Sequence, residues 1–474
     1  MISRRPEAQA PLAPDSTDPL YRQVYERFRS AIAEGTLKAG DRIPSARALA
    51  KEMGVARGTI EVAYSLLAAE GYIQARGQAG TIVAPDLQPQ AAAPAVVAPV
   101  EAADDEHGWH RPPRILPFQM GIPALDAFPR KLWARLGARQ LRGLQAADLS
   151  YPPSDGLPDL RIAVAAYLRV ARGIHCQPAQ VYITSGYNFT MQLIIQALLA
   201  PGDRVWVEDP GYPPTRALLA QARLDAVPVP VDADGLMVAE GVARAGQARA
   251  AVVTPAHQSP LSMSLSLPRR QALLDWAERS QAWIVEDDYD GEYRYVSRPL
   301  PALKSLDTQG RVLYAGSFSK VLFPGMRLAY LVVPEAQVPR FDRISRLLSG
   351  GAPAYTQALL TAFISEGHFG RHIQRMRRLY SERREATAAG LSAALGSRLR
   401  IDSQPGGMHL VARMDGKLRD QPLAARMLEQ GLYAHPLSRW SSLPDPQSGL
   451  LLGFTNIGSQ EQAYEFGLRI RTLM

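Results

Sequence analysis

Apolar residues recur at every fourth position near the start of the chain. Leu20, Val24, Phe28 and Ile32 fall on one side of a helical wheel, with polar residues between them. This period is typical of an amphipathic helix that packs one face on a core. The pattern predicts a helix with Asp18 as its cap and Pro19 in its first turn, which ends near Gly35 because glycine is common just after a helix.

Two further helices and a hairpin are predicted next. A short helix should follow Ser45, a suitable N-terminal cap, and a longer one should span residues 56–70. Residues 72–75 and 81–84 have the composition of two short strands, and the turn between them carries glycines. Three short helices and a hairpin predict a winged helix-turn-helix, which lays its third helix in the major groove of DNA.

From about residue 115 the apolar runs become short and alternate with helical stretches. Helices are expected at 188–199 and 268–280, among others, and strands are expected at 181–184, 205–207, 251–254, 283–286, 312–315 and 328–333. This alternation predicts an α/β fold with a mainly parallel sheet. Because ligands of such sheets bind beyond the carboxyl ends of the strands, the residues that follow each strand are the candidate site.

Two of these strand ends are suited to a phosphate and a ring. Ser185, Gly186 and Tyr187 open a helix, where unpaired backbone N–H groups and the helix dipole favour an anion. Tyr212 follows the next strand and offers an aromatic face for stacking. Either feature alone is common in α/β proteins, so the prediction depends on their combination.

The most informative strand end carries Lys320. A lysine near the inner end of a buried strand loses hydration, which favours the neutral amine that forms a Schiff base with an aldehyde. Ser317 and Ser319 flank it, and Arg327 supplies a planar cationic group of the kind that holds a phosphate. An aldehyde together with a phosphate indicates pyridoxal 5′-phosphate. The alternative for this stretch alone is a Ser-Lys turn on the surface.

A fourth strand end supports the same cofactor. Pyridoxal phosphate requires a carboxylate at its ring nitrogen and is often met by a phenol near its 3′-oxygen. Asp287 and Tyr289 fit these two roles. We therefore predict a pyridoxal phosphate site formed at four strand ends.

Composition limits the remaining possibilities. The chain has 474 residues, which suggests two or three folding units, and a single cysteine, which excludes an internal disulfide framework and fits a reducing cytoplasm. A signal peptide and a membrane span are not expected, and the histidines show no metal-ligand spacing, so we predict no metal. The net charge of +8 permits a polyanionic partner without locating it, because residues 1–85 carry little of the excess.

Segments rich in alanine and proline set the domain boundaries. Residues 1–17 have no hydrophobic period and are expected to be a disordered lead-in. Residues 18–85 form the predicted DNA-binding domain, and residues 86–114 are predicted to be a flexible linker. Residues 115–474 then form the predicted α/β domain.

The N-terminal segment resembles the GntR family of bacterial repressors. The resemblance rests on three stretches in order: Gly40-Asp41-Arg42-Ile43-Pro44-Ser45 with the residues up to Ala50, Gly54 to Ile60, and Leu66 to Tyr72. It implies that double-stranded operator DNA is contacted by Ser45, Arg47, Arg57 and Thr59, and that Arg76, Gly77 and Gly80 form the wing. Ala56 departs from the serine usual in that family, which should weaken one backbone contact.

The remainder of the chain is similar to fold-type I aminotransferases, and the fusion resembles the MocR/GabR subfamily of regulators. The order of the four strand ends carries this resemblance, together with Tyr151 to Gly156 and Leu160-Arg161. It implies a homodimer in which Tyr151 reaches the phosphate of the neighbouring subunit. Two departures are the stretch His257 to Ser262, in place of a Pro-Thr-Gly turn, and Leu451, in place of a carboxylate-binding arginine.

The resemblance also bears on the effector and on function. By similarity to the GabR-type pattern, Arg439 would bind an effector carboxylate, with Arg216 as a weaker second candidate. The favoured hypothesis is a cytoplasmic transcriptional regulator that senses an amino compound through pyridoxal phosphate. An active aminotransferase with a fused DNA-binding domain is the rival, because it would keep the same lysine, aspartate and tyrosine. A sensor of pyridoxal phosphate itself is the third possibility.

Overall fold

The computed structural model describes residues 18–77, 80–86, 114–295, 301–348, 351–402, 406–414 and 418–474. The chain divides into two compact units, Met1–Glu106 and His107–Met474. The lead-in predicted for residues 1–17 and nearly all of the linker predicted for 86–114 lie outside the described residues. Within the described ranges, no helix is both long enough and apolar enough to cross a membrane.

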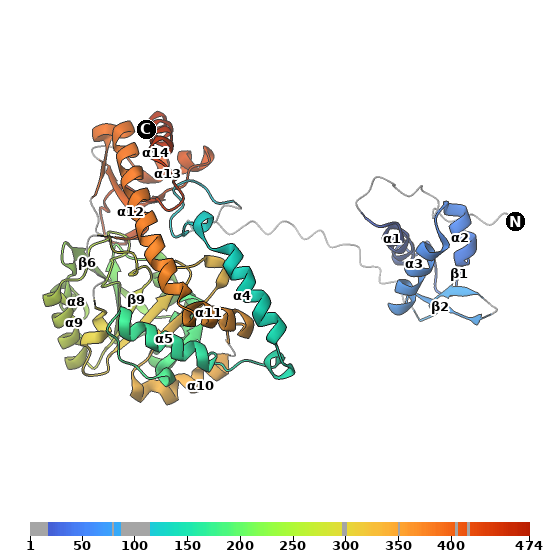
Figure 1. Cartoon of the computed structure of the whole chain (residues 1–474), viewed down its shortest axis with the longest axis horizontal. Helices are drawn as coiled ribbons and strands as arrows, with labels where there is room; N and C mark the ends of the chain where they lie inside the picture. The colour runs from blue at the N-terminus through green and yellow to red at the C-terminus, as the bar shows by residue number, and fades with distance from the viewer. Residues whose placement is uncertain are drawn as a thin grey trace. The chain divides into compact units, whose positions relative to one another are not determined.

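The N-terminal unit contains the predicted three helices and hairpin, plus one short additional strand (Figure 1). In order, its elements are α1 (Leu20–Ala33), β1 (Arg42–Ile43), α2 (Ala46–Met53), α3 (Arg57–Ala69), β2 (Ile73–Ala75) and β3 (Thr81–Val83). The three strands form an antiparallel sheet in the order β1-β3-β2. Val24, Phe28 and Ile32 are buried together with the inner face of α3, as the four-residue period predicts, whereas Leu20, the first residue of α1, is exposed.

The C-terminal unit is built on an eight-stranded sheet in the order β4-β11-β10-β9-β8-β5-β6-β7. Strands β10, β9, β8, β5 and β6 are parallel to their neighbours in that order, whereas β11 runs antiparallel to both β4 and β10. The bounds are β4 (Val181–Thr184), β5 (Arg204–Asp209), β6 (Asp225–Asp232), β7 (Gly235–Leu236), β8 (Ala250–Val253), β9 (Trp283–Asp288), β10 (Val312–Ser317) and β11 (Ala329–Val332). The predicted, mainly parallel α/β sheet is confirmed.

Helices bury both faces of this sheet. They are α4 (Arg130–Gly143), α5 (Pro158–Ala171), α6 (Tyr187–Leu198), α7 (Pro213–Gln221), α8 (Val238–Ala245), α9 (Leu267–Arg279), α10 (Val338–Leu348) and α11 (Ala354–Ser365). The apolar cores that contain β4, β5, β8, β9 and β10 are packed by residues of these helices on either side. This explains why the central strands are apolar almost throughout instead of alternating.

A smaller subdomain completes the C-terminal unit. The long helix α12 (His368–Leu395) runs from the large sheet to this subdomain, where it packs on α14 (Gln460–Leu473) (Figure 1). The other elements are β12 (Leu399–Ile401), β13 (His409–Met414), α13 (Asp420–Glu429), β14 (His435–Pro436) and β15 (Gly449–Gly453), and the strands form an antiparallel sheet in the order β12-β13-β15-β14. Their apolar core includes Leu410, Leu452 and Phe454.

Candidate functional site

The carboxyl ends of β4, β5, β9 and β10 open into one cavity of about 320 Å³. The predicted site residues that line it are Gly186, Tyr187, Tyr212, Asp287, Tyr289, Ser317, Ser319, Lys320 and Arg327. They come from segments far apart in the sequence, so the sheet assembles them. Met120, Met408, His409, His435 and Trp440 close the cavity on the side of the small subdomain.

One end of the cavity is suited to an anion. Gly186 precedes α6 with φ of +113°, which leaves the first N–H groups of this twelve-residue helix facing the cavity end. A Cβ added at Gly186 would lie 3.6 Å from Cζ of Arg327, so the guanidinium stands directly beside the helix start. Ser317 and Ser319 line the same cavity, and the Ser317 hydroxyl accepts a bond from the Ser319 backbone N–H at 3.2 Å. A helix start, two hydroxyls and an arginine together favour a phosphate.

Lys320 lies in the turn that follows β10, as predicted. Its Nζ donates to the backbone oxygen of Gly121 at 2.9 Å. Gly121 has φ of +77°, and a Cβ there would lie only 2.5 Å from Nζ. The backbone conformation therefore favours a glycine where the chain passes the lysine, and a side chain there would displace Nζ.

Asp287 is buried at the end of β9 and is 8% exposed. Burial, together with the nearby carboxylates of Asp288 and Asp290, raises the pKa of its carboxyl well above the usual range, while Lys320 acts in the opposite direction. A protonated ring nitrogen beside this carboxylate would lower that pKa again, because an opposite charge favours the ionised form. The position is therefore matched to a ligand that brings a positive charge.

Tyr289 belongs to a polar group that sequence reasoning did not identify. Nδ1 of His257 lies 3.0 Å from the Tyr289 phenol oxygen and 3.1 Å from a carboxylate oxygen of Asp290. Ser259, in the stretch that departs from the aminotransferase pattern, lines the cavity, and its side chain bonds with Tyr289. Burial raises the pKa of the Tyr289 phenol, so it carries its proton at neutral pH.

Arg172 was also missed by sequence reasoning. It is 2% exposed, its Nε donates to Asp288 at 2.7 Å, and its Nη2 lies 3.0 Å from Glu292. The ion pairs hold Asp288 and Glu292, which lie on either side of Tyr289, and Asp288 directly follows Asp287. No local signal could have revealed this role, because Arg172 and Asp288 are 116 positions apart in the sequence.

Four predicted residues lie outside the cavity lining. Ser185 is half-buried, and Tyr151 is 99% exposed. Arg439 is exposed on the short helix η9 (Leu437–Trp440), and Arg216 donates to the backbone oxygen of Trp440 at 2.8 Å. The roles assigned to them, in cofactor binding from a second subunit and in effector binding, stay predictions.

The residues predicted to contact DNA lie on the N-terminal unit. Arg47, Arg57 and Arg76 are exposed, and Thr59 is half-buried on the first turn of α3. Ser45 caps α2, because its hydroxyl accepts from the backbone N–H of Ala48 at 3.3 Å. Ala56 precedes α3 and provides no side-chain cap.

The wing turn has the predicted glycines in left-handed conformations. Gly77 has φ of +53° and Gly80 has φ of +87°, values that favour glycine. The backbone N–H of Arg76 donates to the oxygen of Gly80 at 2.8 Å, which closes the turn. These local features support the hairpin, and the DNA contacts themselves stay predictions.

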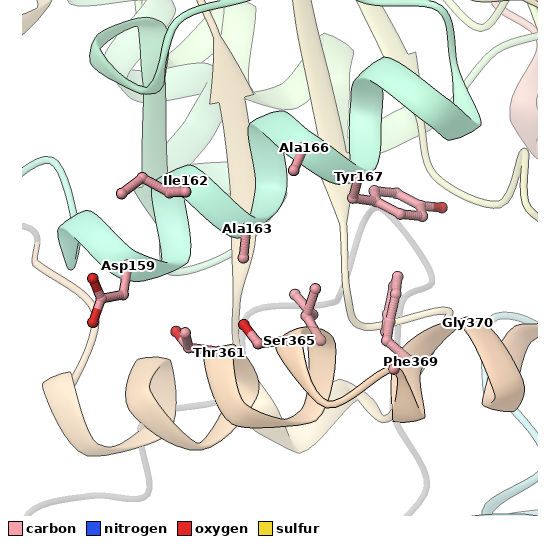
Figure 2. Close-up of a pocket in the computed structure, with 11 residues that line it drawn as sticks. Asp159, Ile162, Ala163, Ala166, Tyr167, Thr361, Ser365, Phe369 and Gly370 are labelled. Carbon is pink, nitrogen blue, oxygen red and sulfur yellow. The ribbon is translucent and has the colours of Figure 1, made fainter.

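A larger hollow of about 640 Å³ lies between α5 and the α11–α12 segment (Figure 2). Figure 2 shows Ile162, Ala163 and Ala166 of α5 above Thr361 and Ser365 of α11. Most of this lining is aliphatic or small, and the Tyr167 hydroxyl donates to Glu292 at 2.9 Å. The hollow gathers no group of charged side chains, so the smaller cavity at the strand ends is the candidate site.

Two family models match separate parts of the chain. Residues 20–83 match the family described as bacterial regulatory proteins, gntR family, and residues 122–446 match aminotransferase class I and II. The chain is 39% identical to the "Probable rhizopine catabolism regulatory protein MocR" of Rhizobium meliloti, covering 94% of this chain and 91% of that protein. It is 33% identical to the "HTH-type pyridoxine biosynthesis transcriptional regulator PdxR" of Corynebacterium glutamicum, covering 96% and 95%.

A solved structure resembles the C-terminal unit. It is the α-aminoadipate aminotransferase LysN from Thermus thermophilus, complexed with N-(5'-phosphopyridoxyl)-L-leucine. The two chains are 27% identical with a TM-score of 0.69, over 76% of this chain and 92% of the other. The cavity thus occurs in a fold shared with an aminotransferase, and the chain is also similar to proteins named as regulators.

Proposed function

Because this chain belongs to the MocR-type regulators, in which a gntR-family DNA-binding domain is joined to an aminotransferase class I and II domain, we propose that it regulates transcription through pyridoxal phosphate held at Lys320. The observation that carries the proposal is the shared cavity of Lys320, Asp287 and Arg327. Since its DNA partner is the chromosome, we place the protein in the cytoplasm.

The residues of the cavity fit each part of the cofactor. The start of α6, Ser317, Ser319 and Arg327 would hold the phosphate. Asp287 would hold the proton of the ring nitrogen, and Tyr212 would cover the ring face. Tyr289, oriented by His257, would donate its phenol hydrogen bond to the 3′-oxygen. When bound, pyridoxal phosphate supplies an aldehyde that condenses with a primary amine and releases water.

The cofactor assignment is tested by absorbance. The purified wild-type protein should be yellow after addition of pyridoxal phosphate, and borohydride should fix the cofactor covalently to Lys320. Lys320→Ala should lose the fixation, whereas Lys304→Ala, which changes a lysine outside the cavity lining, should keep it. Equal fixation in Lys320→Ala and wild type would contradict the proposal.

We also propose that α3 and the wing of the N-terminal unit contact the operator. Arg57 begins α3 and is exposed, although its Nε lies 2.8 Å from Glu61. Arg57→Ala should weaken operator binding by about 1 to 3 kcal/mol if the contact is bidentate to a guanine. Arg29→Ala is the control, because Arg29 is also exposed beside a glutamate, on α1. Equal losses in the two variants would refute the assignment of α3.

A homodimer is proposed for the intact protein. Leu149, at the end of the short helix η3 (Ala146–Leu149), is 76% exposed, and Tyr151, two residues later, is 99% exposed. This segment therefore offers apolar surface that a second copy of the chain could cover. Sedimentation of the cofactor-loaded protein at about micromolar concentration should give the mass of a dimer. A monomer under these conditions would refute this part of the proposal.

A further inference from the structure

The wall of the cavity next to the small subdomain is apolar. Trp440 is 1% exposed and forms a cluster with Val411, Leu437 and Leu451, on which Met120 and Tyr212 pack. Trp440, Met120 and Tyr212 also line the cavity itself. A ligand that extends past the cofactor in this direction therefore meets an indole ring and a thioether, backed by buried aliphatic side chains.

Tyr212 separates this wall from the phosphate end. Its ring centroid lies 5.6 Å from that of Tyr187, at the start of α6, and 5.9 Å from that of Trp440. The three rings thus follow one another from the anion-binding end toward the apolar wall. Arg327 lies beside Gly186, at the anion-binding end of the cavity, where it would hold the phosphate.

The apolar wall contains no cationic partner for a carboxylate among the described residues that line the cavity. Lys320 and Arg327 are the lysine and arginine of that lining, and both serve the cofactor. His409 and His435 complete this side, and burial lowers the pKa of each imidazole to about 4, so both are neutral at pH 7.

Two arginines lie near this wall, and neither lines the cavity. Arg216 donates to the Trp440 backbone oxygen, and its Nη1 lies 3.8 Å from a carboxylate oxygen of Asp209. Asp209 also accepts from the Ser442 backbone N–H at 2.8 Å, which holds the segment after Trp440 in place. Arg439 is exposed, and its charge helps to lower the pKa of His435. Because Arg439 does not line the cavity, a carboxylate bound against Trp440 and Met120 would lose its hydration without a cationic partner among the described lining residues, which is unfavourable.

From this arrangement we infer that the effector is a primary amine whose far end is uncharged and apolar or aromatic, recognised by Trp440 and Met120. The inference rests on the proposed function, since the amine must enter beside cofactor-loaded Lys320. It differs from the expectation that Arg439 holds an effector carboxylate. An apolar wall should favour the ligand without a carboxylate at its far end, whereas a site at Arg439 should favour the ligand with one.

The test uses the full chain loaded with pyridoxal phosphate and pairs of matched ligands. The pairs are 2-phenylethylamine with 4-(2-aminoethyl)benzoate, hexylamine with 6-aminohexanoate, and butylamine with 4-aminobutanoate, so that each carboxylate lies at the end far from the amine. Titration followed by the absorbance of the bound cofactor should give a dissociation constant at least about tenfold lower for each amine than for its carboxylate partner. Tighter binding of the carboxylates, abolished by Arg439→Ala, would overturn the inference.

Variants of the wall give an independent measurement. Trp440→Ala should weaken binding of 2-phenylethylamine by about tenfold or more, and Trp440→Phe should weaken it less, because an aromatic face remains. Tyr464→Ala, which changes an exposed tyrosine on α14, is the control and should not alter binding. An unchanged dissociation constant in a Trp440→Ala protein that still binds the cofactor would also overturn the inference.

Failure of the inference can be separated from failure of the proposed function. If the wild-type protein binds no pyridoxal phosphate, the proposed function is wrong. If it binds the cofactor but none of the three amines changes its absorbance, the cofactor assignment stands and the inferred effector class is wrong.

Discussion

Gly121 determines how closely the backbone approaches Lys320. Its φ of +77° disfavours a side chain, and an added Cβ would lie 2.5 Å from Nζ of the lysine. We expect Gly121→Ala to weaken cofactor binding about tenfold, since the lysine must move or the loop must shift. Titration with pyridoxal phosphate, followed by absorbance, measures the change.

Gly202 provides a matched control for this prediction. Its φ is +90°, and an added Cβ would meet nothing within 4 Å. Gly202→Ala should lower the free energy of unfolding by about 1 kcal/mol and leave cofactor affinity unchanged. If both variants bound the cofactor as wild type does, the close approach at Gly121 would have no functional role.

Glu208 is expected to make stability depend on pH. Burial raises the pKa of its carboxyl from 4.5 to about 7, although Thr254 and Gln258 donate hydrogen bonds to it. Between these pH values the folded protein keeps a proton that the unfolded chain has lost. The free energy of unfolding should therefore fall as pH rises through this window, by up to about 1.4 kcal/mol per pH unit from this group.

The variant Glu208→Gln removes this titration and keeps an oxygen acceptor. Urea denaturation should show that the free energy of unfolding of Glu208→Gln falls less between about pH 5 and pH 7 than that of the wild-type protein. Glu278→Gln changes an exposed glutamate of α9 and should retain the wild-type fall. If the free energy of unfolding depended on pH in the same way in Glu208→Gln and in wild type, titration of Glu208 could not be the cause.

Residue identities at the strand ends were predictable, but their supporting contacts were not. Lys320, Asp287 and Arg327 lie next to strands, so a local pattern locates them in the cavity. Arg172 and His257 act through partners brought close only by the folded sheet. Arg439 was predicted from a resemblance to the GabR-type pattern; its side chain is exposed, and its role stays a prediction.

At the scale of elements, the starts of α2 and α3 differ in capping. Ser45 caps α2 with its hydroxyl, and Ala56 provides no cap for α3. Ser45→Ala should destabilise α2 by about 1 kcal/mol, and Ala56→Ser should stabilise α3 by a similar amount. Hydrogen exchange of the helix amides in the intact chain measures both changes. Faster exchange of α3 in Ala56→Ser would contradict the capping argument.

Most strands of the large sheet were predicted, with β6 (Asp225–Asp232) the clearest omission. It contains Pro228 and Pro230, and proline is usually excluded from strands because it donates no hydrogen bond. The strand is possible because only the two-residue strand β7 pairs with its outer side. The antiparallel direction of β11 was not predicted either, because strand direction depends on the path of the chain between strands and not on strand composition.

At the scale of the whole molecule, regulation requires that occupancy of the cavity change the affinity for DNA. A ligand can shift this equilibrium only by as much as its affinity differs between the two states of the protein. By thermodynamic linkage, operator DNA must then change the affinity for the ligand by the same factor. An aminotransferase with an attached DNA-binding domain would show neither effect.

The most direct test is the operator affinity of the intact protein, measured without cofactor, with pyridoxal phosphate, and with cofactor plus an amine that binds. The account predicts that affinity changes by about fivefold or more between at least two of these states, and that Lys320→Ala binds the operator equally in all three. Release of a keto acid is followed in the same samples. The account would be contradicted if the wild-type protein bound the operator with the same affinity in all three states and also catalysed multiple turnovers with a 2-oxo acid acceptor.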